Sequence, residues 1–317
     1  MSRIFLIRNE AIAIASICIL SGFFALTIGA SWFNNIPSLL RDVSWLGIVV
    51  IGQALVIMSG EFDLSVGSVY AFVSMVFVLL LNEAIPPGLS LLLSLGLAAA
   101  IGYLTGLLTW RLKLPSLLVT LGFLFFYRGM VEWVTDGFPV TIDDEIRSSV
   151  FITLLGGKTL GLHNSIMICA LLVAVFTVML SKFRFGNHLY AVGGDTDVAL
   201  ATGVPAGAIK TWVFVICSGL AGFAGIITAA SLSSVSTTTA TAMELESIAA
   251  VVIGGCLLLG GSGTVWGALL GVVTLLLLKH GLIILGVNIF AYQVCLGVVL
   301  VGLVALKGVV SELELYR

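Results

Sequence analysis

A chain of 317 residues with 60% hydrophobic and only 9% charged residues lies far outside soluble domains, which carry about 25% charged residues. The mean hydropathy of +1.21 supports the same class, an integral membrane protein. A formal net charge of -2 gives no electrostatic basis for binding nucleic acid. The five cysteines lie in apolar runs without the spacing of metal ligands, so we expect neither disulfides nor a metal.

Apolar runs of about 17–25 residues, the length that crosses a bilayer as a helix, recur along the chain. They predict an all-α polytopic membrane protein with about ten transmembrane helices. The expected spans are 11–30, 44–59, 65–82, 88–110, 115–134, 164–181, 210–232, 244–260, 264–282 and 289–306. The first span is longer than the ~7–15-residue core of a signal peptide, which favours a retained anchor.

Basic residues mark one set of loops. With the N-terminus inside, the cytoplasmic segments carry Arg3, Arg8, Arg111, Lys113, Lys182, Arg184, Lys210, Lys307 and Arg317, and the outside segments carry Arg41, Arg147 and Lys158. Because basic residues collect on the cytoplasmic side, this bias predicts that the N- and C-termini are both cytoplasmic. Multiple spans in turn imply contact with the lipid bilayer over much of the surface.

Two carboxylates, Glu61 and Asp63, separate the second and third spans. Gly60 suits the left-handed residue that closes a helix, and Asp63 and Ser65 are natural N-caps for the helix that follows. Irregular backbone at membrane depth is tolerated where it is buried in protein or lines an aqueous cavity. The turn is therefore either a structural cap or the wall of a polar path, and the two roles are compatible.

Glu244 and Glu246 precede the eighth span. If the chain divides into two halves of five helices, their position corresponds to the turn at Glu61 and Asp63, on the opposite side of the membrane. That arrangement predicts an inverted repeat, which is common in transporters.

Other spacings predict structural contacts. Small residues four apart, at Gly102 and Gly106 and again at Gly263, Gly267 and Gly271, predict close helix packing. Arg128 and Glu132 share a helix face, which predicts an ion pair between them.

The longest cytoplasmic segment, 182–210, carries a helical signal of its own. Asp195 can act as an N-cap and Gly203 as the terminating residue, with a two-turn helix between them. Apolar residues at 198–201 are unusual for a short exposed helix. The segment is either a solvated linker or an element that docks into a partner's groove.

Four stretches together resemble the permease subunits of bacterial ABC importers for ribose, xylose and related monosaccharides. They are GEFDLSVG at 60–67, FGNHLYAVGGDTDVALATGV at 185–204, ELESIAAVVIGG at 244–255 and GGSGTVWGALLG at 260–271. Their order along the chain matches the family's "G-G-I-D-L-S-V-G", "GR-x-x-YA-x-GG-N" and "E-L-D-A-I-A-A-V-V-L-G-G" elements and its glycine-rich continuation.

The resemblance implies that residues 1–317 form one ABC transporter permease domain, which works as a dimer with a second permease copy or a paralogous permease. It also implies that the permease lies in the bacterial inner membrane and works with a separate ATP-binding subunit and a periplasmic solute-binding protein. The implied site residues are Gly60, Glu61, Asp63, Ser65 and Gly67 in a translocation-turn motif, Glu244, Glu246, Gly254 and Gly255 in a second-half motif, and Gly193, Gly194, Asp195, Ala199, Leu200 and Gly203 in an ATPase-coupling motif.

The chain shows no pattern of its own for chemistry. The stretch GGKT at 156–159 has Ile152 where a P-loop needs its first glycine, so ATP hydrolysis falls to a partner and we expect neither an enzyme nor a cofactor. Related permeases usually have Asn at the place of Asp195 and a basic residue near Leu200. These departures leave open which ATPase binds and whether the permease dimer is homomeric.

Two other functions remain open. One is an ABC permease for branched-chain amino acids or nucleosides. The other is a proton-coupled secondary transporter in which Glu61 or Asp63 carries the proton, a common task of intramembrane carboxylates.

Overall fold

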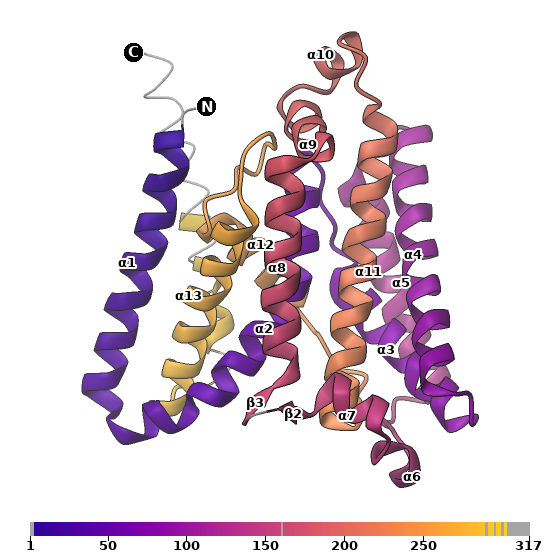
Figure 1. Cartoon of the computed structure of the whole chain (residues 1–317), viewed down its shortest axis with the longest axis vertical. Coiled ribbons are helices and arrows are strands. Elements are labelled where there is room, and N and C mark those ends of the chain that lie inside the picture. The colour runs from indigo at the N-terminus through magenta and orange to yellow at the C-terminus, as the bar shows by residue number, and fades with distance from the viewer. Residues whose placement is uncertain (1–2, 160, 289–290, 295, 299–300, 303–317) are drawn as a thin grey trace.

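The computed structural model describes residues 3–159, 161–288, 291–294, 296–298 and 301–302, and these residues are almost entirely helical. Figure 1 shows a bundle of helices that run along the long axis of the molecule. The end of the bundle that carries the N-terminus is called here the amino end, and the opposite end the far end. The expected class, an all-α polytopic membrane protein, is confirmed.

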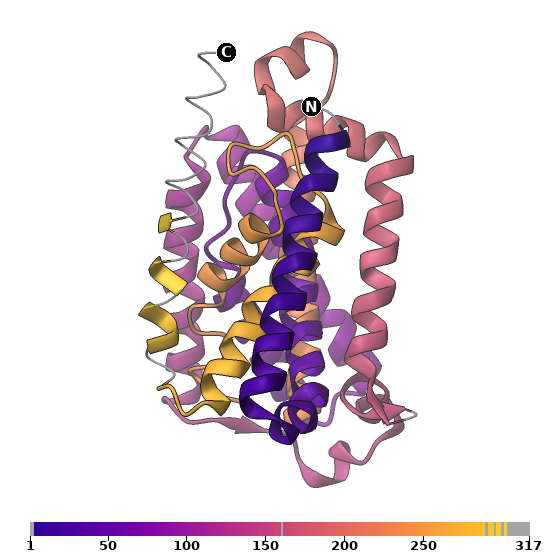
Figure 2. The same ribbon diagram turned by 90° about the vertical axis from the view of Figure 1, so that its left-hand side faces the viewer.

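Seven helices in the described part are long and apolar enough to cross a membrane. They are α1 (Arg3–Ile28), α2 (Ala30–Met58), α4 (Pro87–Arg111), α5 (Ser116–Thr135), α8 (Asn164–Lys182), α11 (Ala206–Leu232) and α13 (Val265–Ile284). Helices α2 and α11 have equally and most deeply buried stretches of these and form the centre of the bundle. Figure 2 shows α1 on the outside, packed beside α13.

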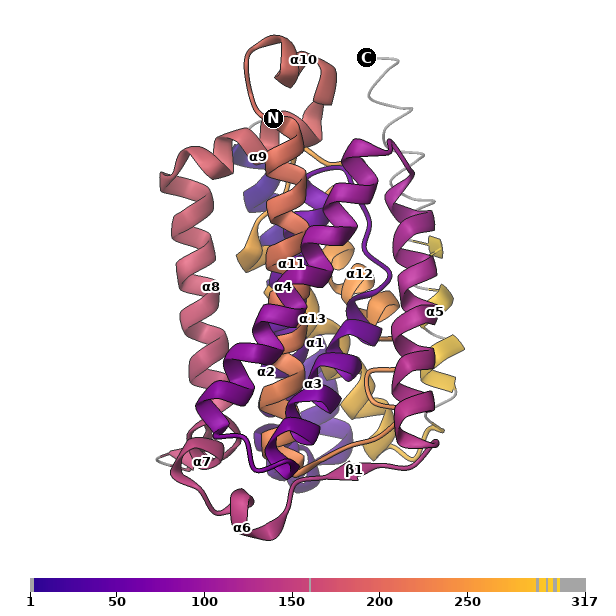
Figure 3. The same ribbon diagram turned by 90° about the vertical axis from the view of Figure 1, so that its right-hand side faces the viewer.

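Two apolar helices, α3 (Val66–Asn82) and α12 (Met243–Ile253), are shorter. At about 1.5 Å per residue they extend about 25 Å and about 16 Å, less than the ~30 Å hydrocarbon core of a bilayer. Both begin inside the bundle rather than at its ends (Figure 3). We call them the two short helices.

The other elements lie at the ends of the bundle (Figures 1 and 3). Helices α9 (Arg184–Gly194) and α10 (Thr196–Ala201) lie at the amino end. The far end carries α6 (Asp144–Arg147), α7 (Val150–Gly156) and the strands β1 (Val140–Thr141), β2 (Lys158–Thr159), β3 (Leu162–His163) and β4 (Ser234–Val235). Strand β1 pairs antiparallel with β4, and β2 pairs antiparallel with β3.

The first two predicted spans differ most from the structure. Residues 31–43 were expected as a loop, but α2 begins at Ala30, directly after Gly29, whose φ of 67° makes the corner between α1 and α2. Polar residues such as Asn35 and Asp42 interrupt the apolar run without interrupting the helix. Hydropathy measures how well a segment suits lipid and not whether it is helical. It therefore does not predict the first turns of α2, before residue 44.

The eighth predicted span, 244–260, is also different. The helix α12 ends at Ile253, and residues 254–264 form a glycine-rich loop that returns toward the amino end. The tenth predicted span, 289–306, lies largely outside the described residues, as do Lys307 and Arg317.

Four of the five glycines at four-residue spacing lie where helix backbones meet, as predicted, whereas Gly263 lies in the loop before α13 against the side chains of Cys256 and Met58. A Cβ at Gly102 would meet the backbone of Phe214, and one at Gly106 would meet Thr211, so both glycines bring α4 against α11. In the second half, Gly267 and Gly271 bring α13 against α12 in the same way. The resulting contacts are backbone to backbone, which suits a membrane protein that cannot rely on the hydrophobic effect between helices.

The first prediction tests this packing. Gly102→Ala should lower the melting temperature of the purified protein, because overpacking of this kind costs about 1–3 kcal/mol. Gly96→Ala is the matched control on the same helix, since a Cβ there meets no atom within 4 Å, and Ala should gain roughly 0.5–1 kcal/mol in helix propensity. Equal melting temperatures for the two variants would contradict the close approach of α4 and α11.

Candidate functional site

The helix α2 ends at the amino end in the conformation that the sequence predicts. Gly60 has a φ of 81°, its N–H donates to the Ile57 carbonyl at 3.0 Å, and the Glu61 N–H donates to the Val56 carbonyl at 3.1 Å. These two bonds form a Schellman motif, which satisfies the last carbonyls of the helix. From Glu61 the chain turns back into the bundle in an extended form until α3 begins at Val66.

Two glycine pairs, Gly193–Gly194 and Gly260–Gly261, meet the single glycine Gly60 beside this turn. A Cβ on Gly193 would collide with the Met58 carbonyl, and a Cβ on Gly260 would collide with Gly60, so no larger residue fits. The Gly261 N–H donates to the Met58 carbonyl at 2.9 Å. We call this contact of residues 58–60, 193–194 and 260–261 the glycine junction. It joins the predicted translocation-turn motif to Gly193 and Gly194 of the predicted coupling motif.

Helix α9 is also tied to the loop that precedes α13. The Tyr190 hydroxyl donates to the Gly263 carbonyl at 2.9 Å. Burial, with a smaller contribution from Cys256, raises the pKa of Tyr190 to about 12, so the phenol remains a donor at neutral pH. Through this bond and the glycine junction, α9 contacts the segment that follows α2 and the loop that follows α12.

Glu61 forms an ion pair with Lys210. The Lys210 Nζ lies 2.6 Å from Glu61 Oε1, and the two side chains are only 12% and 14% exposed. Lys210 lies in the first turns of α11, just after the segment of α9 and α10. A charged pair that is mostly removed from water depends on both partners, so loss of either would leave a costly buried charge.

Asp63 is fully buried and holds the entry to α3. Its Oδ1 accepts the Ser65 N–H at 2.8 Å and the Ser65 hydroxyl at 2.6 Å, and its backbone carbonyl accepts the Gln53 side-chain amide at 3.1 Å. The expectation that Asp63 caps the helix is wrong in detail. The N-cap is Ser65, whose side chain makes no capping bond, and Asp63 closes the turn before it. Its second oxygen, Oδ2, is buried without a hydrogen-bond partner.

The two short helices point their N-termini at each other inside the bundle. The position that a Cβ of Gly67, in the first turn of α3, would occupy is filled by the Glu244 carboxylate and the Ala240 carbonyl from the start of α12. The free N–H groups of a helix N-terminus carry a partial positive charge, which favours a carboxylate there. Gly67 and Glu244, taken from the two predicted motifs, therefore lie in contact.

The chain reaches α12 from the far end through a run of hydroxyl side chains. Eight of the eleven residues 231–241 are Ser or Thr. Arg128 on α5 holds this segment, because its Nη1 donates to the Thr237 carbonyl at 2.9 Å and to the Thr239 carbonyl at 2.8 Å. The expected direct ion pair between Arg128 and Glu132 does not form in the described structure, although the charges of both Glu244 and Glu132 still act on Arg128.

This hydroxyl-rich segment has an unusual backbone. Ala240 and Ala242 have φ values of 58° and 63°, which cost of order 1–3 kcal/mol for residues other than glycine. Such strain persists only where the surroundings fix it, here through the bonds from Arg128 and the contact with Gly67. Thr238 and Thr241 are exposed, and although their hydroxyls bond within the segment, to the Ser236 hydroxyl and the Thr238 carbonyl, each hydroxyl oxygen can still accept a bond from a ligand.

The sequence does not point to this segment as a site, and it assigns Arg128 only a structural ion pair with Glu132. The predicted spans 210–232 and 244–260 leave residues 233–243 as the break between two helices. A run of hydroxyl side chains between two apolar segments was the available signal, because polar residues at membrane depth tend to line a path or a binding site.

The second-half motif is only partly gathered at this site. Glu246 lies two residues after Glu244 in α12, on another face of the helix, and pairs with Lys279 of α13 at 2.7 Å. Gly254 and Gly255 end α12 at the side of the glycine-rich loop, in a second Schellman motif in which Cys256 N–H donates to the Val251 carbonyl. Glu61 pairs with Lys210 whereas Glu244 lies against Gly67, so the two residues do not make matching contacts, and the inverted repeat stays a prediction.

The predicted coupling segment folds as two helices. Asp195 caps α10 through bonds from the Asp197 and Val198 N–H groups at 2.9 and 3.0 Å, and Gly203 follows it with a φ of 84°. Ala199 is buried, whereas Val198 and Leu200 are 59% and 44% exposed. The helix α9, which covers Gly193 and Gly194, was not expected as a separate helix.

Within the described residues, no group of three or more His, Cys, Asp or Glu side chains is placed to hold a metal ion. The chemistry available at the centre is instead that of hydroxyl groups, backbone carbonyls, Arg128 and Glu244. Such groups can bind a polar ligand through hydrogen bonds.

Discontinuous helices whose N-termini meet inside a helix bundle are typical of membrane transport proteins. The sequence comparison agrees with that class. The chain belongs to the family described as "Branched-chain amino acid transport system / permease component", whose model matches residues 35–304.

Curated relatives cover nearly the whole chain. The "Probable ABC transporter permease protein YphD" of Escherichia coli is 38% identical over 92% of this chain and 87% of its own length. The ribose import permease protein of Escherichia coli is 33% identical over 88% of both chains. The xylose/arabinose import permease protein of Sulfolobus acidocaldarius is 34% identical over 86% of this chain and 77% of its own. No solved structure matches the chain.

The second prediction concerns Asp63. Asp63→Asn keeps an acceptor for the two bonds from Ser65 and should assemble with a melting temperature near that of the wild type. Asp63→Leu leaves a buried N–H and hydroxyl unsatisfied and should cost about 1–3 kcal/mol. Equal stability of the two variants would exclude the turn-closing role. If Asp63→Asn assembles but supports no transport, the charge itself is needed.

Proposed function

We propose that this chain is the membrane-spanning permease subunit of an ATP-driven importer that moves a monosaccharide or a related polyol. The observation that carries the proposal is the central site, where the N-termini of the two short helices meet beside the hydroxyl-rich segment of residues 231–241. A sugar loses the water around each hydroxyl on entering a membrane, at roughly 1–3 kcal/mol per unpaired group. Thr238, Thr241 and the neighbouring carbonyls offer replacement partners.

The similarity to ribose and xylose/arabinose import permeases over most of the chain supports the same cargo class. We infer that residues 1–317 form one permease domain, which lies in a bacterial inner membrane with both termini in the cytoplasm. Arg111, Lys113, Lys182, Arg184 and Lys210 belong to segments at the amino end, and the positive-inside rule makes that end cytoplasmic.

The proposed partners are an ATP-binding subunit, a periplasmic solute-binding protein, and a second permease that is either a copy or a paralogue. The exposed Val198 and Leu200 on α10 offer an apolar contact at the amino end. The ATP-binding subunit would dock there, and α9 would pass its movement through the glycine junction to both short helices. The turn motif at Gly60, Glu61, Asp63 and Ser65 would then move with the short helices and form part of the wall of the sugar path.

A second candidate is a permease of the same type for branched-chain amino acids, which the family description names. An amino acid brings a carboxylate and an ammonium, and Arg128 and Glu244 could bind these two groups. In the structure, however, Nη1 of Arg128 already donates to two carbonyls. The hydroxyl-rich segment therefore favours a sugar.

The third prediction separates an ATP-driven importer from a proton-coupled carrier. In vesicles that contain the permease with its ATP-binding subunit and binding protein, sugar uptake should continue after a protonophore collapses the proton gradient while internal ATP is held constant. Uptake that stops with the gradient at constant ATP would reject the proposal.

The fourth prediction places the ATPase contact on α10. Leu200→Asp should insert and fold normally but lose co-purification with the ATP-binding subunit and all ATP-driven uptake, because a charge would be buried in an apolar contact. Leu154→Asp on α7 is the matched control, an exposed leucine at the far end that should retain both properties. Unchanged association of Leu200→Asp, measured at equal membrane expression, would leave α10 as a linker.

A further inference from the structure

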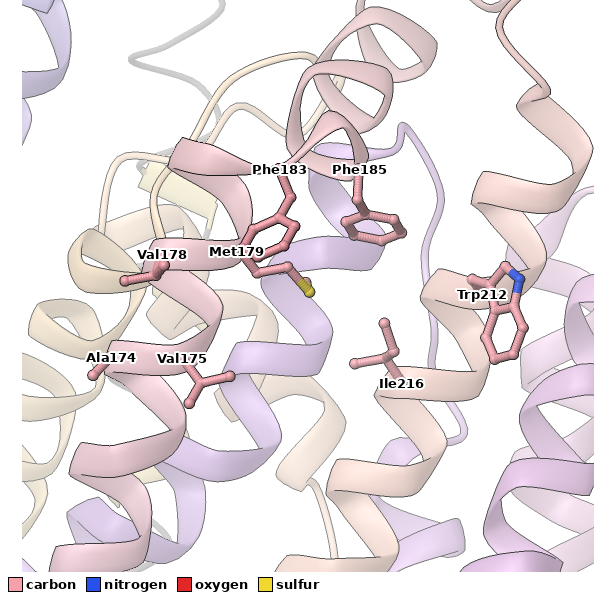
Figure 4. Close-up of a pocket in the computed structure, with 8 residues that line it drawn as sticks. All are labelled: Ala174, Val175, Val178, Met179, Phe183, Phe185, Trp212 and Ile216. Carbon is pink, nitrogen blue, oxygen red and sulfur yellow. The ribbon is translucent and has the colours of Figure 1, made fainter.

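An apolar groove opens on the outside of the bundle between α8 and α11, just below α9. Its volume is about 800 Å³, within the range of about 300–1,000 Å³ that is typical of ligand sites. Figure 4 shows Val175, Val178 and Met179 of α8 on one side and Trp212 and Ile216 of α11 on the other, with the rings of Phe183 and Phe185 above them. Among these side chains only the indole nitrogen of Trp212 is a hydrogen-bonding group.

The rim of this groove at the amino end is positively charged. Lys182 is the last residue of α8 and Arg184 the first of α9, so the two cations flank Phe183, whose ring lies over the groove. Both side chains are exposed, and neither forms an ion pair within the described part of the chain. On the other side of Trp212, a second cavity is lined by Trp110 and Arg111.

The order of groups along the groove is that of a phospholipid. An apolar floor is followed by aromatic rings, and these are followed by cations. Tryptophan at the boundary between hydrocarbon and headgroups is characteristic of membrane proteins, and basic pockets between transmembrane helices bind anionic headgroups.

We propose that the groove between α8 and α11 binds one anionic phospholipid from the leaflet at the amino end, with an acyl chain against Met179 and Ile216 and its phosphate at Lys182 and Arg184. Charge complementarity favours this occupant over a second copy of the chain. A two-fold interface sets the same patch on both subunits around one axis, which would bring the unpaired cations of both copies together.

The experiment uses the purified full chain in phosphatidylcholine nanodiscs. Brominated phosphatidylglycerol or brominated phosphatidylcholine is added in increasing mole fraction. The quenching of Trp212 is obtained as the difference between the wild type and Trp212→Phe. We expect half-maximal quenching at a several-fold lower mole fraction of phosphatidylglycerol than of phosphatidylcholine. Equal values for the two lipids in the wild type would overturn the proposal.

Variants of the rim and of the floor test the two parts of the site. Replacement of both cations, Lys182→Gln with Arg184→Gln, should remove the preference, by up to roughly 25-fold if each cation contributes about fivefold. The control Arg147→Gln with Lys158→Gln removes two exposed cations at the far end and should leave the preference intact. A preference that survives loss of the rim cations would overturn the assignment of the headgroup.

The floor variant Ile216→Phe fills the groove without changing charge, so it should weaken quenching by both lipids. Light scattering of the same sample reports the oligomeric state, which should remain that of the wild type. If Ile216→Phe instead dissociates the oligomer and leaves lipid quenching unchanged, a second copy occupies the groove and the lipid proposal is rejected.

Discussion

The structure depends on one constraint, which is that backbone polar groups inside a membrane must find partners within the protein. A continuous helix meets this constraint by itself, but α3 and α12 begin inside the bundle and expose free N–H groups there. The groups that surround these two N-termini are the ones that meet the requirement. The Asp63 carboxylate takes the Ser65 N–H before α3, and the Glu244 carboxylate lies against Gly67 at the start of the same helix.

The same constraint explains why Arg128 lies at this depth. An arginine in a transmembrane helix is costly unless its donors are satisfied. Here its guanidinium donates to the Thr237 and Thr239 carbonyls, which belong to an irregular segment and so have no intrahelical N–H partner. The polar groups at the centre therefore satisfy one another's hydrogen bonds. Any ligand that enters must exchange bonds with groups that are already partnered.

Much of the local structure could be predicted because it depends on adjacent residues. The Schellman motif at Gly60, the cap at Asp195 and the glycine contacts of Gly102 and Gly267 each follow from a few letters of sequence. The depth of a helix in the bundle does not. Apolar residues continue past Ile253, so hydropathy extended α12 by seven residues into a loop whose path is set by Gly260 and Gly261 meeting Gly193, a contact between distant parts of the chain. The partners of Arg128 were missed for the same reason, since the spacing rule could see only Glu132.

The ion pairs bear on how movement could pass between the ends of the molecule. Glu61 lies in the turn before α3, and Glu246 lies near the start of α12. Each forms an ion pair with a lysine on a long helix, Glu61 with Lys210 of α11 and Glu246 with Lys279 of α13. Because both pairs are mostly shielded from water, separation of either pair would leave a buried charge without its partner, at a cost of several kcal/mol. The short helices should therefore move together with the long helices that hold them. Helix α9 contacts the segment before α3 through Gly60 and the loop after the C-terminal end of α12 through Gly261, so a displacement of α9 would bear on the chain that enters one short helix and on the chain that leaves the other.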